Sequence, residues 1–244
     1  MSPTKNPDIT LFFLNASRAI RIAFLLEALN LPYKLVTADR APNGLAPPDF
    51  KAQIRAAGQP LGKSPTMKDG GLVVTESGSI TEYMLETYDT GHNLLPAAAE
   101  DPAARAKVRE WLYAAEGTFM LHAMAILYAR WQLPDTEEIR AGILPGLEEK
   151  LAVNVCNSFD WLEGELVAQR NRGSGWLVGD GLTAADIVVQ FSVQFIMERR
   201  LGVGGRGEGR WKEVEAWLGR TEQDDAYLRA VQKTGYSLDG EFRK

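Results

Sequence analysis

Residues 62–78, G-K-S-P-T-M-K-D-G-G-L-V-V-T-E-S-G, form the stretch that decides the fold. Ser64 precedes a proline, which favours extended backbone and leaves its N–H and C=O free to pair outside a helix. The Asp-Gly turn between two short extended segments predicts a tight hairpin. Glu76 and Ser77 then stand at a helix start, where unpaired N–H groups favour anions. This arrangement suits a small peptide ligand with an amine and a carboxylate, and an ordinary strand followed by a capped helix is the alternative.

A strand–helix–strand unit is predicted upstream of the hairpin. Residues 9–14 are a short apolar run typical of a strand buried on both faces. Residues 19–29 place apolar side chains at helical spacing and end at a proline, and residues 33–37 predict a second strand. Such a unit implies a parallel pair joined by a right-handed crossover. With the hairpin and the helix after Glu76, the order is that of a thioredoxin-like domain.

The rest of the chain predicts helices. We place the domain boundary near residues 90–100, which gives domains 8–90 and 100–240. One long helix is expected to about Trp131 and a second over about 137–169, broken near Pro145. Further helices are expected at 183–199, which begins with a Thr-x-x-Asp capping box, at 211–220 and at 224–233.

Composition excludes several classes of function. The chain has 244 residues, 45% of them hydrophobic, and a formal net charge of −5 with both signs interspersed, so nucleic acid is not an expected partner. The polar N-terminus predicts no secretory signal, and no apolar stretch is long enough for a transmembrane segment. A single cysteine, Cys156, excludes an internal disulfide. It forms no recognised metal-binding spacing with His92 and His122. We therefore expect a reduced, soluble, cytoplasmic protein without a metal.

Several stretches resemble known proteins. Residues 14–21, 62–65 and 76–80 resemble the corresponding parts of cytosolic glutathione transferases. The Ser17-Arg18 pair and residues 113–118 and 182–186 resemble a fungal and bacterial branch of that family. The similarity covers about residues 8 to 232.

This resemblance implies the glutathione transferase fold, in which an α/β thioredoxin-like N-terminal domain binds glutathione and the C-terminal domain is all-α. It also implies a homodimer. The implied activity is transfer of glutathione, as co-substrate, onto a small hydrophobic electrophile. A glutathione-dependent isomerase, reductase or lyase of secondary metabolism, or a non-catalytic binding protein with the same fold, are the alternatives.

The resemblance also implies how glutathione is held. Ser64, kept extended by a cis Pro65, would pair its main chain with the cysteinyl segment. Glu76 would meet the γ-glutamyl ammonium, and Ser77 the α-carboxylate through its hydroxyl and N–H. Lys63 would meet the glycyl carboxylate, with a solvated surface lysine as the alternative.

The chemistry of such a site is thiol activation. Lowering a thiol pKa of about 8.5 by about two units requires about 3 kcal/mol, and one hydrogen bond to a charged acceptor supplies about 1.5–3 kcal/mol. A single donor at the turn after the first strand is therefore sufficient. Ser17 is the first candidate and Asn15 the second, with a backbone N–H or water also open. The best-known serine-type members carry their serine several residues before the arginine, where this chain has Leu14, and Ser17 alternatively serves as a helix N-cap.

The acceptor substrate is expected between the domains, against the first long helix. Tyr113, Glu116 and Met120 stand on successive turns of that helix and are candidates to line its pocket. Packing in the core, or contact with a second subunit, is the alternative role for these side chains.

Overall fold

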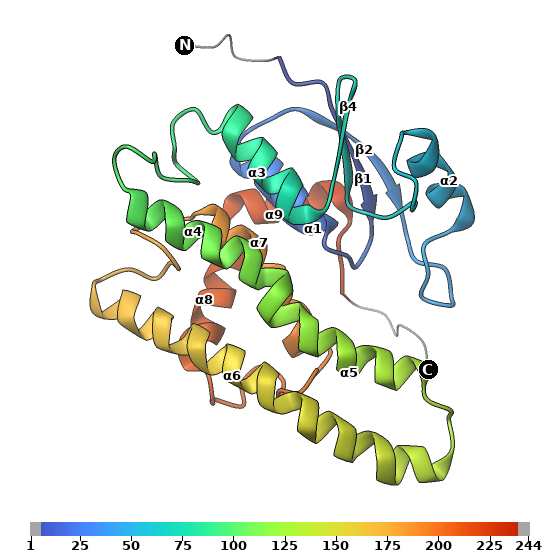
Figure 1. Ribbon diagram of the computed structural model, residues 1–244. Coiled ribbons are helices and arrows are strands. Elements are labelled where there is room, and N and C mark those ends of the chain that lie inside the picture. Colours follow the sequence, from blue (N-terminus) through green and yellow to red (C-terminus); the bar gives the residue numbers. More distant parts are fainter. Residues whose placement is uncertain (1–5, 239–244) are drawn as a thin grey trace. The chain divides into compact units, whose positions relative to one another are not determined.

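A computed structural model describes residues 6–238, which form two compact units (Figure 1). The first comprises residues up to 105 together with 222–238, and the second comprises residues 106–221. Helix α9 (Asp225–Thr234), which lies within the predicted domain 100–240, packs against α1 (Ala19–Ala28) in the first unit. The domain limits 8–90 and 100–240 stay a prediction. No helix within residues 6–238 is both long and apolar enough to cross a membrane.

The first unit contains a four-stranded sheet in the order β2-β1-β3-β4. Its elements are β1 (Ile9–Leu14), α1, β2 (Tyr33–Ala38), α2 (Pro48–Ala56), β3 (Thr66–Asp69), β4 (Leu72–Thr75) and α3 (Ser77–Tyr88). The β1–β2 pair is parallel, whereas β1–β3 and β3–β4 are antiparallel. The hairpin turns at Gly70, whose φ of 61° suits glycine. The predicted thioredoxin-like order is confirmed.

Strand β1 is covered on both faces, as its continuous apolar sequence predicts. Phe12 and Leu14 pack in one cluster with Phe50 and Ile54 of α2. Because side chains alternate along a strand, Leu11 and Phe13 point to the opposite face, and both are 0% exposed. The turn at residues 15–18, which follows β1, is therefore attached to a strand that is packed on both faces.

Helix α3 is anchored to β3 through one buried carboxylate. Asp69 is 1% exposed and accepts hydrogen bonds from the hydroxyls of Tyr83, at 2.6 Å, and Tyr88, at 2.5 Å. Burial, followed by the hydrogen bond to Asp69, raises the pKa of Tyr88 above its ordinary value. These bonds set the position of α3 on the sheet, and hence the position of its first turn.

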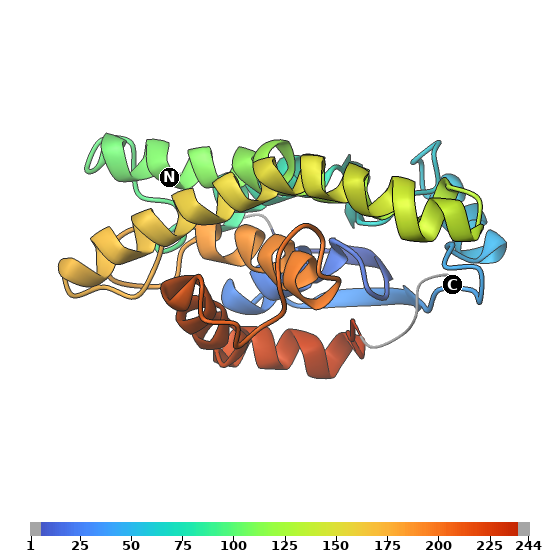
Figure 2. The same ribbon diagram turned by 90° about the horizontal axis from the view of Figure 1, so that it is seen from below.

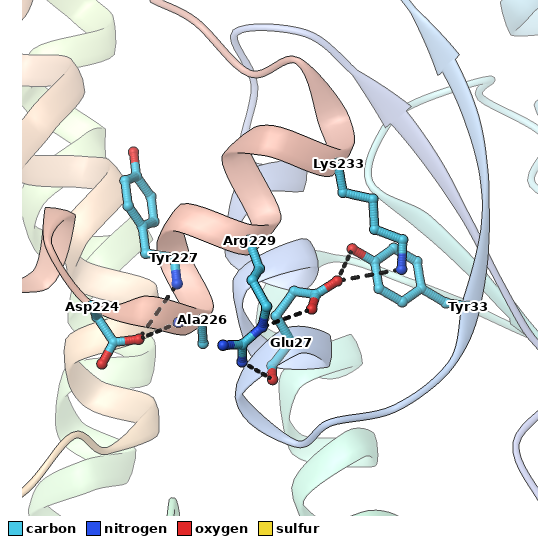
Figure 3. A network of polar contacts seen from close by, with 7 residues as sticks. All are labelled: Glu27, Tyr33, Asp224, Ala226, Tyr227, Arg229 and Lys233. Atoms are coloured by element: carbon cyan, nitrogen blue, oxygen red, sulfur yellow. Dashed lines mark hydrogen bonds and ion pairs between the residues drawn. The ribbon is translucent and has the colours of Figure 1, made fainter.

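Helix α9 is held beside α1 by the carboxylate of Glu27, as Figure 3 shows. Its oxygens lie 3.3 Å from Arg229 Nε and 3.3 Å from Lys233 Nζ, and Tyr33 donates its hydroxyl to Glu27 at 2.9 Å. Lys233 also lies over the Tyr33 ring, 3.5 Å from its centroid. Figure 2 shows α9, in red, beside the blue elements of the first unit. The last helix thus belongs structurally to the sheet domain.

The second unit consists of helices. The first long helix is confirmed as α4 (Pro102–Ala114), the π-helix η1 (Ala115–Met120) and α5 (Leu121–Gln132) in succession. The π-helix η2 (Ile139–Ile143) leads directly into α6 (Leu144–Asn171), so the predicted break near Pro145 is wrong. Pro145 stands in the first turn of α6, directly after the π-helix η2. Helices α7 (Ala184–Glu198) and α8 (Lys212–Glu222) follow.

The predicted capping box of α7 is present. Thr183 donates its N–H and its hydroxyl to Asp186 Oδ2, both at 2.9 Å. Asp186 Oδ1 accepts from Leu177 N at 2.9 Å and from Trp217 Nε1 at 2.8 Å. Burial raises the pKa of Asp186, and these hydrogen bonds oppose that effect. One carboxylate therefore starts α7 and ties it to α8.

Candidate functional site

The turn after β1 uses the side chain of Ser17 for its own structure. Ser17 Oγ donates to Leu14 O at 2.7 Å and accepts from Ala19 N at 3.2 Å, and the residue is 8% exposed. This hydroxyl therefore supports the start of α1. The backbone N–H of Ser17, in contrast, donates to no group among residues 6–238. It is an available donor at the N-terminal end of a helix, where the helix dipole favours negative charge.

Asn15 connects three segments of the first unit. Its Nδ2 donates to Asp39 Oδ1 at 3.0 Å and to Gly235 O at 3.3 Å. Its Oδ1 accepts from Ala16 N at 2.7 Å and from Ser237 N at 3.1 Å. Both amide hydrogens thus have acceptors within the protein. The segment after α9 was missed by the sequence analysis because more than 200 residues separate it from Asn15.

Ser64 is joined to the end of β1. The Ser64-Pro65 peptide bond is cis, as the resemblance implies. Ser64 Oγ donates to Phe12 O at 2.8 Å and accepts from Leu14 N at 3.0 Å, which brings residue 64 next to the turn at 15–18. The backbone N–H and C=O of Ser64 make no hydrogen bond within the described part of the chain. An extended main chain with open donor and acceptor is what a peptide ligand requires.

The start of α3 offers further donors. Its first helical hydrogen bond runs from Ile80 N to Glu76 O at 2.9 Å, and no acceptor among the described residues takes the N–H groups of Ser77 and Gly78. Ser77 is 6% exposed, and its Oγ accepts from Arg21 Nη1 of α1 at 3.1 Å. Glu76 is exposed and has a φ of 66°. A non-glycine residue at positive φ costs about 1–3 kcal/mol and is a reason to suspect function.

Of the four candidate ligand-holding residues, two have side chains that are hydrogen-bonded to neighbouring elements and two have exposed side chains. Ser64 touches the turn after β1, and Ser77 is tied to α1 through Arg21. Lys63 is exposed; its backbone N–H donates to Gln59 Oε1 at 3.2 Å, and its backbone carbonyl accepts from Thr66 Oγ1 at 2.7 Å. The side chains of Lys63 and Glu76 are therefore accessible, whereas those of Ser64 and Ser77 are held in place.

Comparison with known proteins identifies the family of this chain. The family model of the glutathione S-transferase N-terminal domain matches residues 7–86, and that of the C-terminal domain matches residues 146–225. Glutathione S-transferase 3 of Schizosaccharomyces pombe is 36% identical over 230 residues, which cover 92% of this chain and 87% of the relative. The chain belongs to the glutathione S-transferase family.

Solved structures agree with this assignment. A crystal structure of a glutathione S-transferase from Actinobacillus pleuropneumoniae matches with a TM-score of 0.75 and 31% identity, covering 95% of this chain and 94% of that one. Ure2p in complex with glutathione has the same fold, with a TM-score of 0.74, 21% identity and coverage of 93% and 95%. The family's C-terminal model ends at residue 225, just before the body of α9.

The expected acceptor-pocket residues differ in accessibility. Tyr113 is 65% exposed, Glu116 is half-buried and Met120 is 1% exposed. These three positions share a face in a regular α-helix, but the π-helix η1 begins at Ala115 and inserts extra backbone into the turn. Met120 is buried whereas Tyr113 is exposed, so the three side chains do not form one accessible face.

The second unit has a polar cavity beside this π-helix. The cavity has a volume of about 330 Å³. It is lined by Gly117, Thr118, His122, Asn154, Asn157, Ser158 and Trp161. Among the described residues, no group of three or more acidic, histidine and cysteine side chains is arranged to hold a metal ion.

Proposed function

We propose that this protein conjugates the thiolate of glutathione to small hydrophobic electrophiles. The observation that carries the proposal is the open main chain of Ser64 beside the turn after β1, in the same unit as the donor-rich start of α3. An extended peptide pairs with such a segment, and its anionic end suits a helix N-terminus. Membership of the glutathione S-transferase family and the names of its relatives support the same chemistry.

The parts of glutathione are assigned to four residues. Ser64 pairs its N–H and C=O with the cysteinyl segment. Glu76 receives the γ-glutamyl ammonium, because its carboxylate is exposed. Ser77 binds the α-carboxylate through its hydroxyl and the N–H groups of the first turn of α3. Lys63, also exposed, binds the glycyl carboxylate.

Thiol activation is assigned to Ser17, through its backbone N–H. Its hydroxyl is already committed to Leu14 O, whereas its N–H has no acceptor among the described residues. A hydrogen bond to a charged acceptor contributes about 1.5–3 kcal/mol, which corresponds to about one to two pKa units. Asn15 acts by holding this turn, because its own amide hydrogens have acceptors in Asp39 and Gly235.

The acceptor site and the dimer interface are assigned to the first long helix. Glu116 is half-buried and lines the acceptor pocket, and the neighbouring exposed Tyr113 borders it. Leu121 lies eight residues after Tyr113 and Tyr128 seven residues after Leu121, and they are 61% and 52% exposed. Such an apolar stripe suits a second subunit, so we propose a homodimer. Light scattering that reports the mass of a single 26.9 kDa chain at micromolar concentration would contradict it.

A cytoplasmic, detoxifying member of the fungal and bacterial branch fits these assignments. Relatives come from a fission yeast and a bacterium, and the Ser17-Arg18 pair resembles that branch. The one cysteine, Cys156, is free and requires no oxidising compartment. Small hydrophobic electrophiles are the substrates that such a role demands.

Two measurements test the proposal. Calorimetric titration with glutathione should give saturable binding, and a spectrophotometric panel should show conjugation with aryl halides and epoxides. Activity only with disulfides or isomerisable substrates would replace conjugation by reductase or isomerase chemistry. Binding without turnover of any substrate would leave a glutathione-binding protein. No binding of glutathione would overturn the proposal.

A further inference from the structure

Arg21 is a cation in the interior of the first unit. It lies on α1, is 1% exposed, and its neighbours Ile20 and Ile22 are 0% exposed. Its Nη1 donates to Ser77 Oγ at 3.1 Å, so the guanidinium reaches from α1 to the first residue of α3. Burying a charge is costly unless the charge is paired and hydrogen-bonded.

The chemistry of this pair directs the Ser77 hydroxyl. A guanidinium has five N–H donors and no acceptor, so Ser77 Oγ must accept from it. The hydrogen of the same hydroxyl is therefore left for another acceptor. Ser77 Oγ donates to no group in the part of the chain that the structure describes. The hydroxyl is thus an oriented donor, polarised by a positive charge behind it.

The surroundings of Ser77 point to an anion as the missing acceptor. The N–H groups of Ser77 and Gly78 likewise have no acceptor among residues 6–238. The N-terminal end of α3 adds a partial positive charge to that of Arg21. Three donors and a buried cation therefore meet at one helix start.

We propose that Arg21 is a positioning residue for the α-carboxylate of the γ-glutamyl arm. It does not touch the ligand. It orients the Ser77 hydroxyl toward the carboxylate and supplies a positive charge that favours the carboxylate over a neutral group. This inference rests on the proposed function and names the part of the substrate that the Arg21–Ser77 pair selects.

The decisive probe is a pair of peptides. Glutathione carries the α-carboxylate, whereas γ-aminobutyryl-cysteinyl-glycine lacks it and keeps the ammonium, the thiol and the glycyl end. Arg21→Met, which replaces a buried charge by an apolar side chain of similar length, should lower the affinity for glutathione about tenfold. Its affinity for the shortened peptide should change by less than twofold. Arg55→Met, which removes an exposed charge on α2, controls for net charge and should leave both affinities unchanged.

A cycle with Ser77 tests whether Arg21 acts through this hydroxyl. In the Ser77→Ala background only the charge of Arg21 still acts on the carboxylate, so Arg21→Met should lower glutathione affinity about threefold instead of tenfold. Arg21→Lys, which keeps a cation but cannot copy the guanidinium geometry, should lower it about threefold and leave the shortened peptide unaffected. Circular dichroism checks that each variant folds. If Arg21→Met does not fold, Arg21→Lys decides by the same comparison.

The outcomes separate this inference from the proposed function. A parent protein that does not bind glutathione contradicts the proposed function itself. A parent that binds, with Arg21 variants that lower both affinities equally or neither, limits Arg21 to joining α1 and α3 and overturns the inference. If the losses of glutathione binding free energy in Arg21→Met and Ser77→Ala add fully in the double variant, the inference is overturned as well.

Discussion

Two turns of the first unit, at residues 15–18 and 76–78, share a strained backbone but use their side chains differently. Ala16 has a φ of 51° and Glu76 a φ of 66°. After β1, the hydroxyl of Ser17 and the amide of Asn15 are bonded to the protein itself. At α3, Glu76 is exposed, and the Ser77 hydroxyl accepts a bond without giving one among the described residues. A suitable residue type therefore contributes to ligand chemistry only where the fold leaves its donor unused.

The largest effect is expected at α3. Glu76→Ala or Ser77→Ala should weaken glutathione binding by about 1–3 kcal/mol, because each leaves a charged group of the ligand without its partner. Isothermal calorimetry measures the change. Ser79→Ala, at an exposed position in the same turn, serves as the control and should bind as the parent does. Unchanged affinity in both Glu76 and Ser77 variants would place the ligand elsewhere.

The next effect is expected on stability, from the hydrogen bond between Tyr88 and Asp69 that holds α3 on the sheet. This effect should depend on pH. Tyr88→Phe removes a hydrogen bond to the buried Asp69 and should cost about 1 kcal/mol of unfolding free energy at pH 8. Because the pKa of Tyr88 is raised in the folded protein, the unfolded chain loses this proton first, from about pH 10 upward. The contribution of Tyr88 is therefore complete below pH 10 and declines above it.

Urea unfolding of parent and variant at pH 8 and pH 10.5 measures this difference. The gap between the two proteins should narrow at the higher pH. Tyr33 also has a raised pKa and is present in both proteins, so its effect cancels. A gap that stays constant or widens would show that Tyr88 does not favour its protonated form in the folded state.

A smaller effect is expected at the turn after β1. Ser17→Ala keeps the backbone N–H, so the pKa of the thiol of bound glutathione should rise by less than one unit, which corresponds to under about 1.4 kcal/mol. Direct donation by the hydroxyl would instead raise that pKa by about one to two units and lower turnover at neutral pH about ten- to a hundredfold. Ultraviolet titration of the thiolate distinguishes the two cases. A large shift in Asn15→Ala alone would transfer the role to Asn15.

The smallest effect is expected from relieving the positive φ angles at Ala16 and Glu76. Ala16→Gly and Glu76→Gly should each raise unfolding stability by about 0.5–1 kcal/mol, because the relief of positive φ exceeds the extra chain entropy of glycine. Thermal unfolding measures both. Glu76→Gly should nevertheless lose glutathione affinity, whereas Ala16→Gly should keep it. If the two variants bind glutathione equally well, the two turns do not differ in their contribution to ligand binding.

Much of the first unit follows from local sequence. The apolar run at 9–14, the Asp-Gly turn and the open main chain of Ser64 were predicted from residues that lie close together in the chain, and the structure contains all of them. The packing of α9 on α1 was less predictable, because it depends on Glu27 and Arg229, which are 202 residues apart. Helical periodicity alone does not indicate which unit receives a helix.

The sequence by itself determined the element types and the residues able to bind a peptide, because propensity, turn chemistry and the effect of proline act over a few neighbours. Only the tertiary structure decided which donors remain available. It committed the Ser17 hydroxyl to Leu14, buried Met120, and brought Arg21 to Ser77. These outcomes depend on hydrogen bonds and packing between segments distant in the chain, for which no local pattern exists.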